Sequence, residues 1–189
     1  MIPLSLYRVF NVKSHSVTRN TLLKEIESSD GYECTTDDFN GDYISAISKT
    51  NWDKVPLVNV RWPYFLVKED NHSFVNFLER EYGAKERGWT ITKEWFNQYY
   101  PNSGSDHPWH HHSRPNGDWV NGIACVYYIE LKDKSLRTVL KNPKTGKEII
   151  PRVKEGQILT FDANMYHKSP RNFSSTRKTV ISFNIEFGK

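Results

Sequence analysis

NGIACVYYIEL, residues 121–131, is a run of β-branched, aromatic and small apolar residues that is typical of a buried β-strand. Other short runs of this kind extend from Trp89 to the C-terminus: WTITKEWFNQYY (89–100), LRTVLKN (136–142), KEIIPRV (147–153), GQILTFDA (156–163) and KTVISFNIEF (178–187). The residues NPKTG between two of these runs predict a hairpin. Short strands that follow one another without intervening helices favour an antiparallel sandwich or jelly roll.

The N-terminal half contains two helix patterns. In TRNTLLKEIESS (18–29), Leu22, Leu23 and Ile26 form one apolar stripe, and in EDNHSFVNFLEREYGA (69–84) the aromatic and leucine residues recur at helical spacing. Both helices are amphipathic, so we expect each to cover one face of a sheet.

Length and composition predict one globular domain. The chain has 189 residues, of which 37% are hydrophobic and 25% charged, as in a soluble protein with a packed core. We therefore expect a single domain over 1–189 of the α+β class, mainly β. Residues 88–189 would form a double-stranded β-helix (jelly roll, cupin-like) core, and 1–87 a helical buttress packed on one sheet.

Charge, hydropathy and cysteine usage exclude little. The formal charge is +4, and the Lys and Arg residues are scattered along the sequence, so nucleic acid stays open as a partner without being favoured. No run approaches the roughly 18 apolar residues of a membrane span, and MIPLSLYRVF lacks the pattern of a signal peptide, which predicts a cytoplasmic protein. Cys34 and Cys125 form no CxxC motif and are expected to be reduced thiols, with Cys125 in the core.

Three consecutive histidines raise the question of a metal site. On an extended strand, the side chains of His110 and His112 lie on one face and that of His111 on the other. His167 follows the strand pattern VKEGQILTFDA, and in a jelly roll a late strand can run beside an early one and bring His167 to the same place. Imidazole ligands suit Fe, Zn, Cu and Ni. An HxH motif alone is equally compatible with a polar, histidine-rich loop.

A cationic pair begins the last strand. A cation beside a metal must be compensated, and an anionic small molecule would do so. Strand alternation lets only one of Arg177 and Lys178 face inward. We expect Arg177 to do so, because its planar fork suits a carboxylate and Thr179 on the same face can add a hydroxyl donor. A solvent-facing Arg/Lys pair at a loop end is the alternative.

Taken together, several phrases resemble the 2-oxoglutarate and Fe(II)-dependent oxygenase superfamily, in particular its small phage-type members. The phrases are WFNQYY (95–100), WHHH (109–112), GIACVYYIEL (122–131), EGQILTFDANMYHKSPRN (155–172) and RKTVISFN (177–184), and the resemblance covers roughly 88–187. It implies that His110, His112 and His167 are the iron ligands. The superfamily places Asp or Glu where this chain has His112, which leaves a ferrous site one unit more positive. Asp106 and Asp118 are carboxylates nearby, although neither has the ligand spacing.

The resemblance also implies a co-substrate site and a reaction. Arg177 and Thr179 match the residues that hold the distal carboxylate of 2-oxoglutarate, and Asn97 and Tyr99 match an NxY pair that touches the same molecule. The implied enzyme is a dioxygenase that couples decarboxylation of 2-oxoglutarate by O2 to hydroxylation of a second substrate. The loop 113–121 would be a lid or an ordinary connection.

Two other readings stay open, and so does the substrate. One is a cupin-like dioxygenase or isomerase that uses the three histidines for another metal, and the other is a non-catalytic jelly roll that binds a metal. The prime substrate is a protein side chain, a nucleic acid or a small metabolite. If the chain is phage-encoded, its expected place is the host cytoplasm.

Overall fold

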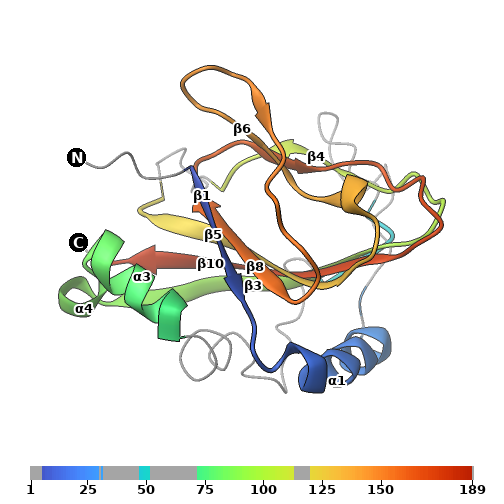
Figure 1. The fold of residues 1–189 in the computed structure, drawn as a ribbon, viewed down its shortest axis with the longest axis horizontal. Helices are drawn as coiled ribbons and strands as arrows, with labels where there is room; N and C mark the ends of the chain where they lie inside the picture. The colour runs from blue at the N-terminus through green and yellow to red at the C-terminus, as the bar shows by residue number, and fades with distance from the viewer. Residues whose placement is uncertain (1–5, 30, 32–46, 52–71, 113–119, 189) are drawn as a thin grey trace.

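The architecture consists of two antiparallel sheets with helices on one outer face (Figure 1). The computed structural model describes residues 6–29, 31, 47–51, 72–112 and 120–188. The expected α+β, mainly β, jelly-roll class is confirmed by this arrangement. None of the helices within the described residues is long and apolar enough to cross a membrane.

Each sheet mixes segments that are distant in sequence. The six-stranded sheet has the order β1 (Tyr7–Asn11), β8 (Gln157–Asp162), β5 (Gly122–Leu131), β10 (Lys178–Phe187), β3 (Trp89–Tyr99), β2 (Lys49–Thr50). The four-stranded sheet has the order β4 (His107–His110), β9 (His167–Ser169), β6 (Val139–Lys141), β7 (Glu148–Ile149). The helices are α1 (His15–Ser28), α3 (His72–Tyr82) and α4 (Ala84–Arg87), with a 3-10 turn, η3 (Lys134–Leu136).

Two hydrophobic cores explain why β5 is apolar at nearly every position. One core lies between α1, α3 and the outer face of the six-stranded sheet, and it contains Ile123, Cys125 and Tyr127 from β5. The other core lies between the two sheets and contains the alternate residues Val126 and Tyr128. Because both faces of β5 are covered, its sequence reads as a continuous apolar run. Cys125 is a buried free thiol, as expected.

The helix predictions are confirmed. Leu22, Leu23 and Ile26 are buried on α1, and Phe74 and Leu78 are buried on α3. The predicted hairpin around NPKTG is also present, since β6 pairs antiparallel with β7.

The N-terminal half, for which the sequence predicts a helical buttress over 1–87, also contains strands. β1 pairs with β8 and β2 pairs with β3, so this half also supplies both outer strands of the six-stranded sheet. These pairings are long-range and leave no local signal in so short a stretch. Cys34, Asp118 and most of the predicted loop 113–121 lie outside the described residues.

Candidate metal centre

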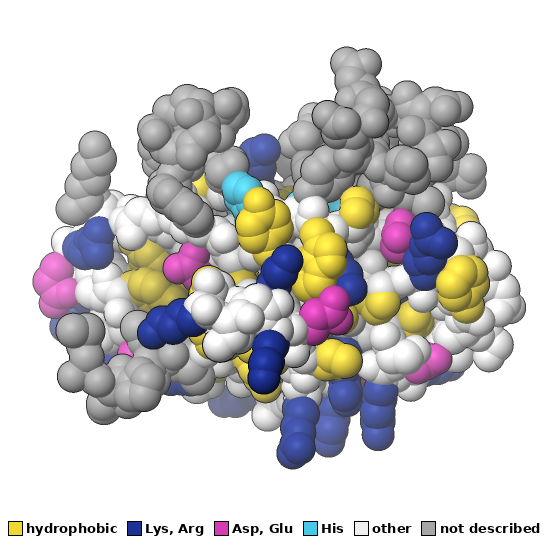
Figure 2. All heavy atoms as spheres, turned by 90° about the horizontal axis from the view of Figure 1, so that it is seen from above, with side chains coloured by type: hydrophobic (Ala, Val, Ile, Leu, Met, Phe, Trp, Pro, Cys, Tyr) yellow, Lys and Arg dark blue, Asp and Glu magenta, His cyan; other side chains and the backbone are white. Residues whose placement is uncertain are grey.

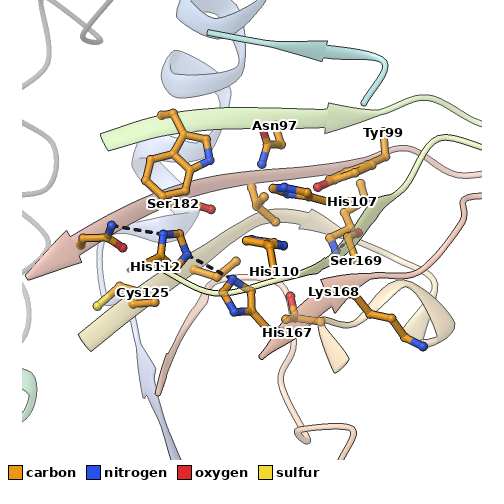
Figure 3. A pocket seen from close by; sticks show the side chains of 17 residues that line it. Asn97, Tyr99, His107, His110, His112, Cys125, His167, Lys168, Ser169 and Ser182 are labelled. Carbon is orange, nitrogen blue, oxygen red and sulfur yellow. Dashed lines mark hydrogen bonds between the residues drawn. The ribbon is translucent and has the colours of Figure 1, made fainter. Parts of the chain in front are cut away.

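Two neighbouring strands of the small sheet bring the three predicted histidines together. His110 on β4 lies directly opposite His167 on β9 in the antiparallel register. The backbone N–H of His112 donates to the carbonyl of Ala163 at 2.9 Å, which holds the chain beyond β4 against the turn before β9. Figure 3 shows the three imidazoles converging in one pocket.

The histidines are arranged as a ligand group. One ring nitrogen of each lies within 4.8 Å of the others, and the Nε2 atoms of His112 and His167 are 3.2 Å apart. The Nδ1 atoms of His110 and His167 lie 2.8 and 2.9 Å from the carbonyls of Pro108 and Met165. A carbonyl only accepts hydrogen bonds, so Nδ1 carries the proton in both rings and the lone pair is on Nε2. The nitrogens that face one another can therefore bind a cation.

Burial keeps these rings neutral. It lowers the pKa of His110 to about 4 and that of His112 to about 3, and it places the pKa of His167 well below the usual value. Neighbouring imidazoles lower the pKa of His112 and His167 further. A neutral imidazole is the form that coordinates a metal. The donor set therefore fits a divalent transition metal such as Fe(II), which the three rings would hold from one side.

Asn184 on β10 supports the third ligand. Its Nδ2 lies 3.3 Å from Nδ1 of His112, while its Oδ1 is buried and has no hydrogen-bond partner among the described residues. The two amide atoms look alike in shape, so a half-turn of the amide places Oδ1 against Nδ1–H of His112. That orientation pairs Oδ1 with the His112 N–H and leaves Nε2 of His112 as the ligand atom, while Nδ2 moves to the position that has no hydrogen-bond partner among the described residues.

His111 lies outside the pocket, as alternation predicted. Its ring packs against Tyr166, with ring centroids 4.7 Å apart. Asp106 is not part of this ligand group and pairs with Arg171 at 3.4 Å, while Asp118 lies outside the described residues.

The prediction that Arg177 faces the pocket is wrong. Arg177 points to the helix side, where its guanidinium lies 2.9 Å from Oε1 of Glu27 and 2.7 Å from Oε2 of Glu130. Thr179 shares that side and donates to the same Glu130 oxygen at 2.6 Å, so it is not a pocket residue either. Arg177 and Lys178 do face opposite sides, as strand alternation requires. Arg177 is the one that faces away from the pocket, because Glu27 and Glu130 compensate its charge there.

Lys178 faces the pocket instead. Its side chain is 1% exposed, its Nζ donates to Oγ of Ser169 at 2.8 Å, and it lies 4.9 and 5.7 Å from the ring centroids of Tyr99 and Tyr128. Burial lowers the pKa of Lys178 to about 7. No acidic side chain is among the described residues that line the pocket, which encloses about 410 Å³ including its opening to solvent. An anion is therefore the missing counter-charge.

The NxY pair lies on the same wall. Asn97 and Tyr99 both line the pocket from β3, where residues two apart share one face of the strand, and both are labelled in Figure 3. The Asn97 amide nitrogen donates to Oγ1 of Thr50 at 2.8 Å, and that hydroxyl donates to the carbonyl of Phe96 at 2.8 Å, which fixes the amide from β2. Burial raises the pKa of Tyr99 far above its usual value, so its hydroxyl stays protonated and can donate.

His107 is a pocket residue that the sequence analysis missed. It is 4% exposed and stacks on His110, with ring centroids 3.8 Å apart and 13° between the planes. Residues three apart on a regular strand face opposite sides, but the β4–β9 register shifts between His107 and His110. This irregularity turns both rings inward, and a period of two cannot reveal it. Trp95 also lines the pocket and was not predicted to do so. It lies two residues before Asn97 on the same strand, so strand alternation could have placed it on the pocket face.

Comparison with known proteins identifies the fold. No family model and no curated sequence matches the chain. A prolyl-4-hydroxylase from Pseudomonas putida matches with a TM-score of 0.62 and 10% identity, covering 97% of this chain and 92% of that protein. A 2OG-Fe(II) oxygenase family oxidoreductase from Burkholderia pseudomallei matches with a TM-score of 0.64, 9% identity and coverage of 96% and 84%. The viral collagen prolyl hydroxylase of Paramecium bursaria Chlorella virus-1, solved with 2OG, matches with a TM-score of 0.56, 12% identity and coverage of 98% and 97%.

The chain thus has the fold of the 2OG-Fe(II) oxygenases, and the resemblance seen in the sequence is confirmed at that level. The identities are low, so the likeness speaks for the fold. The chemistry has to be argued from the pocket.

Proposed function

We propose that the chain is a non-haem Fe(II) dioxygenase that uses 2-oxoglutarate to hydroxylate a second substrate. His110, His112 and His167 would hold the iron. The observation that carries the co-substrate is Lys178, a buried cation in a pocket whose described lining contains no carboxylate. A dicarboxylic keto acid fits both features, because one end can chelate a metal and the other can pair with an ammonium.

The pocket residues suit this orientation. The distal carboxylate of 2-oxoglutarate would pair with Nζ of Lys178 and accept from the Tyr99 hydroxyl, and Ser169 holds the ammonium from the far side. His107 lies between this end and the ring of His110, so its position favours a contact with the body of the molecule (Figure 3). These groups come from strands of both sheets, which makes the pocket rigid.

When bound, the iron would supply the activation of O2, and the balanced reaction consumes 2-oxoglutarate, O2 and a C–H bond and yields succinate, CO2 and a C–OH group. The chain contributes orientation and exclusion of water. It keeps three imidazoles neutral by burial, fixes two of them through backbone carbonyls, and offers one ammonium to one carboxylate. The prime substrate would enter through the open side of the pocket.

Succinate is the product that tests this proposal. The full chain with Fe(II), O2 and 2-oxoglutarate should form succinate even without a prime substrate, at a slow uncoupled rate. A His167→Ala variant should form none, whereas Arg177→Met should form it at the wild-type rate. Tight iron binding without any succinate, under a range of reductants, contradicts the proposal.

The all-histidine ligand set supports a second candidate. Three neutral imidazoles, with no carboxylate in the group that the described residues form, also suit a cupin-like dioxygenase whose own substrate chelates the metal. Such an enzyme would consume O2 with a chelating substrate and would release no succinate from 2-oxoglutarate.

A further inference from the structure

One short segment of the chain has an excess of positive charge. Residues 141–154 hold five of the 26 Lys and Arg residues but only one of the 22 Asp and Glu residues. This segment therefore carries a formal charge of +4, which equals the net charge of the whole chain. The segment around the β6–β7 hairpin is therefore locally basic, although most Lys and Arg residues lie elsewhere in the sequence.

The hairpin presents its lysines from an ordered turn. Lys141, Lys144 and Lys147 are exposed and make no ion pair with another described residue. The side-chain oxygen of Asn142 accepts from the backbone N–H of Lys144 at 2.9 Å. The backbone N–H of Asn142 donates to the carbonyl of Lys147 at 2.9 Å. The acidic residue of the hairpin, Glu148, is already paired with Lys168 at 2.9 Å. The three exposed charges are therefore available to a ligand.

Aromatic side chains of the four-stranded sheet lie beside Lys141 and Lys168. The ring of Trp109 on β4 lies 5.8 Å from Nζ of Lys141 and 4.5 Å from Nζ of Lys168. Tyr166 is 47% exposed and is joined to β6 by the hydrogen bond from the Lys141 N–H to its carbonyl. Figure 2, which looks onto this side of the molecule, shows Lys and Arg side chains interspersed with hydrophobic ones and with Asp and Glu. Lys168 also contributes to the lining of the pocket, and in Figure 3 its side chain extends away from the histidines.

We propose that this face, formed by Trp109, Lys141, Lys144, Lys147, Tyr166 and Lys168, binds single-stranded nucleic acid. Exposed lysines neutralise phosphates, and flat aromatic rings between them stack with unpaired bases. Lys141 and Lys168 lie over the ring of Trp109, and their side chains are flexible. When a base stacks on the ring, their ammonium groups can turn to the neighbouring phosphates. An acidic peptide would satisfy the charges, but a nucleic acid has a planar base with every phosphate, so the combination of lysines and rings favours nucleic acid. Of these residues only Lys168 also lines the metal pocket, and the proposal does not depend on the proposed reaction.

The test is the binding of a fluorescently labelled oligothymidylate of about 15 nucleotides, followed by anisotropy at increasing salt. The wild-type chain should bind with an affinity that falls as salt rises. Changing Lys141, Lys144 and Lys147 together to Gln should lower the slope of log affinity against log salt by about 2, since each phosphate contact to a single strand contributes about 0.7. Trp109→Ala should weaken binding roughly tenfold and leave the slope unchanged.

A matched variant controls for net charge. Lys13, Lys24 and Lys85 are exposed on other parts of the chain, and their joint change to Gln removes the same three charges. It should leave the slope near that of the wild type, and both triple variants should unfold at the wild-type temperature. The proposal is overturned if the oligonucleotide does not bind at low salt, if the two triple variants behave alike, or if polyglutamate displaces it as well as unlabelled oligonucleotide does.

Discussion

Replacing Lys178 by Met should weaken the binding of 2-oxoglutarate strongly and leave metal binding intact. The ammonium is 1% exposed and hydrogen-bonded to Ser169, and no carboxylate lines the described pocket. A charge-assisted hydrogen bond contributes about 1.5–3 kcal/mol, and two unit charges 4 Å apart at an effective dielectric constant of 20 attract by about 4 kcal/mol. A loss of about 2–4 kcal/mol corresponds to a dissociation constant raised about 30- to 1000-fold.

The same residue predicts how binding depends on pH. Burial lowers the pKa of Lys178 to about 7, so the unliganded amine loses its proton as the pH rises through that value. Only the ammonium pairs with a carboxylate, and binding above this pKa must take up a proton. The affinity for 2-oxoglutarate should therefore be highest below about pH 7 and should fall by up to tenfold per pH unit above it. Lys178→Arg should bind without this dependence, because a guanidinium stays charged.

Isothermal titration of the iron-loaded chain with 2-oxoglutarate, without oxygen and from pH 6.5 to 9, measures both effects. Arg177→Met is the matched control, since it removes the neighbouring cation of the same strand, and it should change the affinity less than about twofold. A larger loss in Arg177→Met than in Lys178→Met would refute the assignment of β10 facing. A wild-type affinity that rises with pH would refute the role of the ammonium.

Other variants and conditions test the metal centre. His167→Ala should abolish stoichiometric iron binding while His111→Ala retains it, as measured by metal analysis after gel filtration; equal losses would contradict the ligand set. Asn184→Ala should lower the metal affinity about 10- to 100-fold, because His112 loses the hydrogen bond that orients its ring. Competition with a chelator measures this affinity, and an unchanged value would exclude an orienting role for Asn184. In metal-free protein, the pKa of His110 is lowered to about 4 and that of His112 to about 3. The unfolded chain therefore binds more protons, and the free energy of unfolding should fall between pH 6.5 and about 4 in urea titrations; a flat profile would show that these rings are not buried.

The sequence analysis found the features that alternation and turn residues encode. The HxH spacing predicted that His110 and His112 share a face, and the turn after the strand pattern at 156–163 predicted that His167 could join them. The inward positions of Asn97 and Tyr99 follow from the same period of two. The helices were found because their apolar stripes are local signals.

The wrong or missing predictions concern side chains whose direction depends on contacts with residues distant in the sequence. Alternation allowed either Arg177 or Lys178 to face inward, and the choice depends on Glu27 and Glu130, which come from α1 and β5. Nothing near Arg177 in the sequence identifies these partners. His107 enters the pocket through a register shift that has no sequence signature of its own. The basic face was also invisible, since it requires knowing that Trp109, Tyr166 and Lys141 are neighbours.

Anaerobic addition of 2-oxoglutarate to the Fe(II)-loaded chain tests most directly whether one pocket binds both the iron and 2-oxoglutarate. Chelation of the iron by the keto acid should produce a weak visible charge-transfer band. The band should be absent in His167→Ala and should need a higher 2-oxoglutarate concentration in Lys178→Met than in Arg177→Met. Tight iron binding with no band at any 2-oxoglutarate concentration would contradict the account.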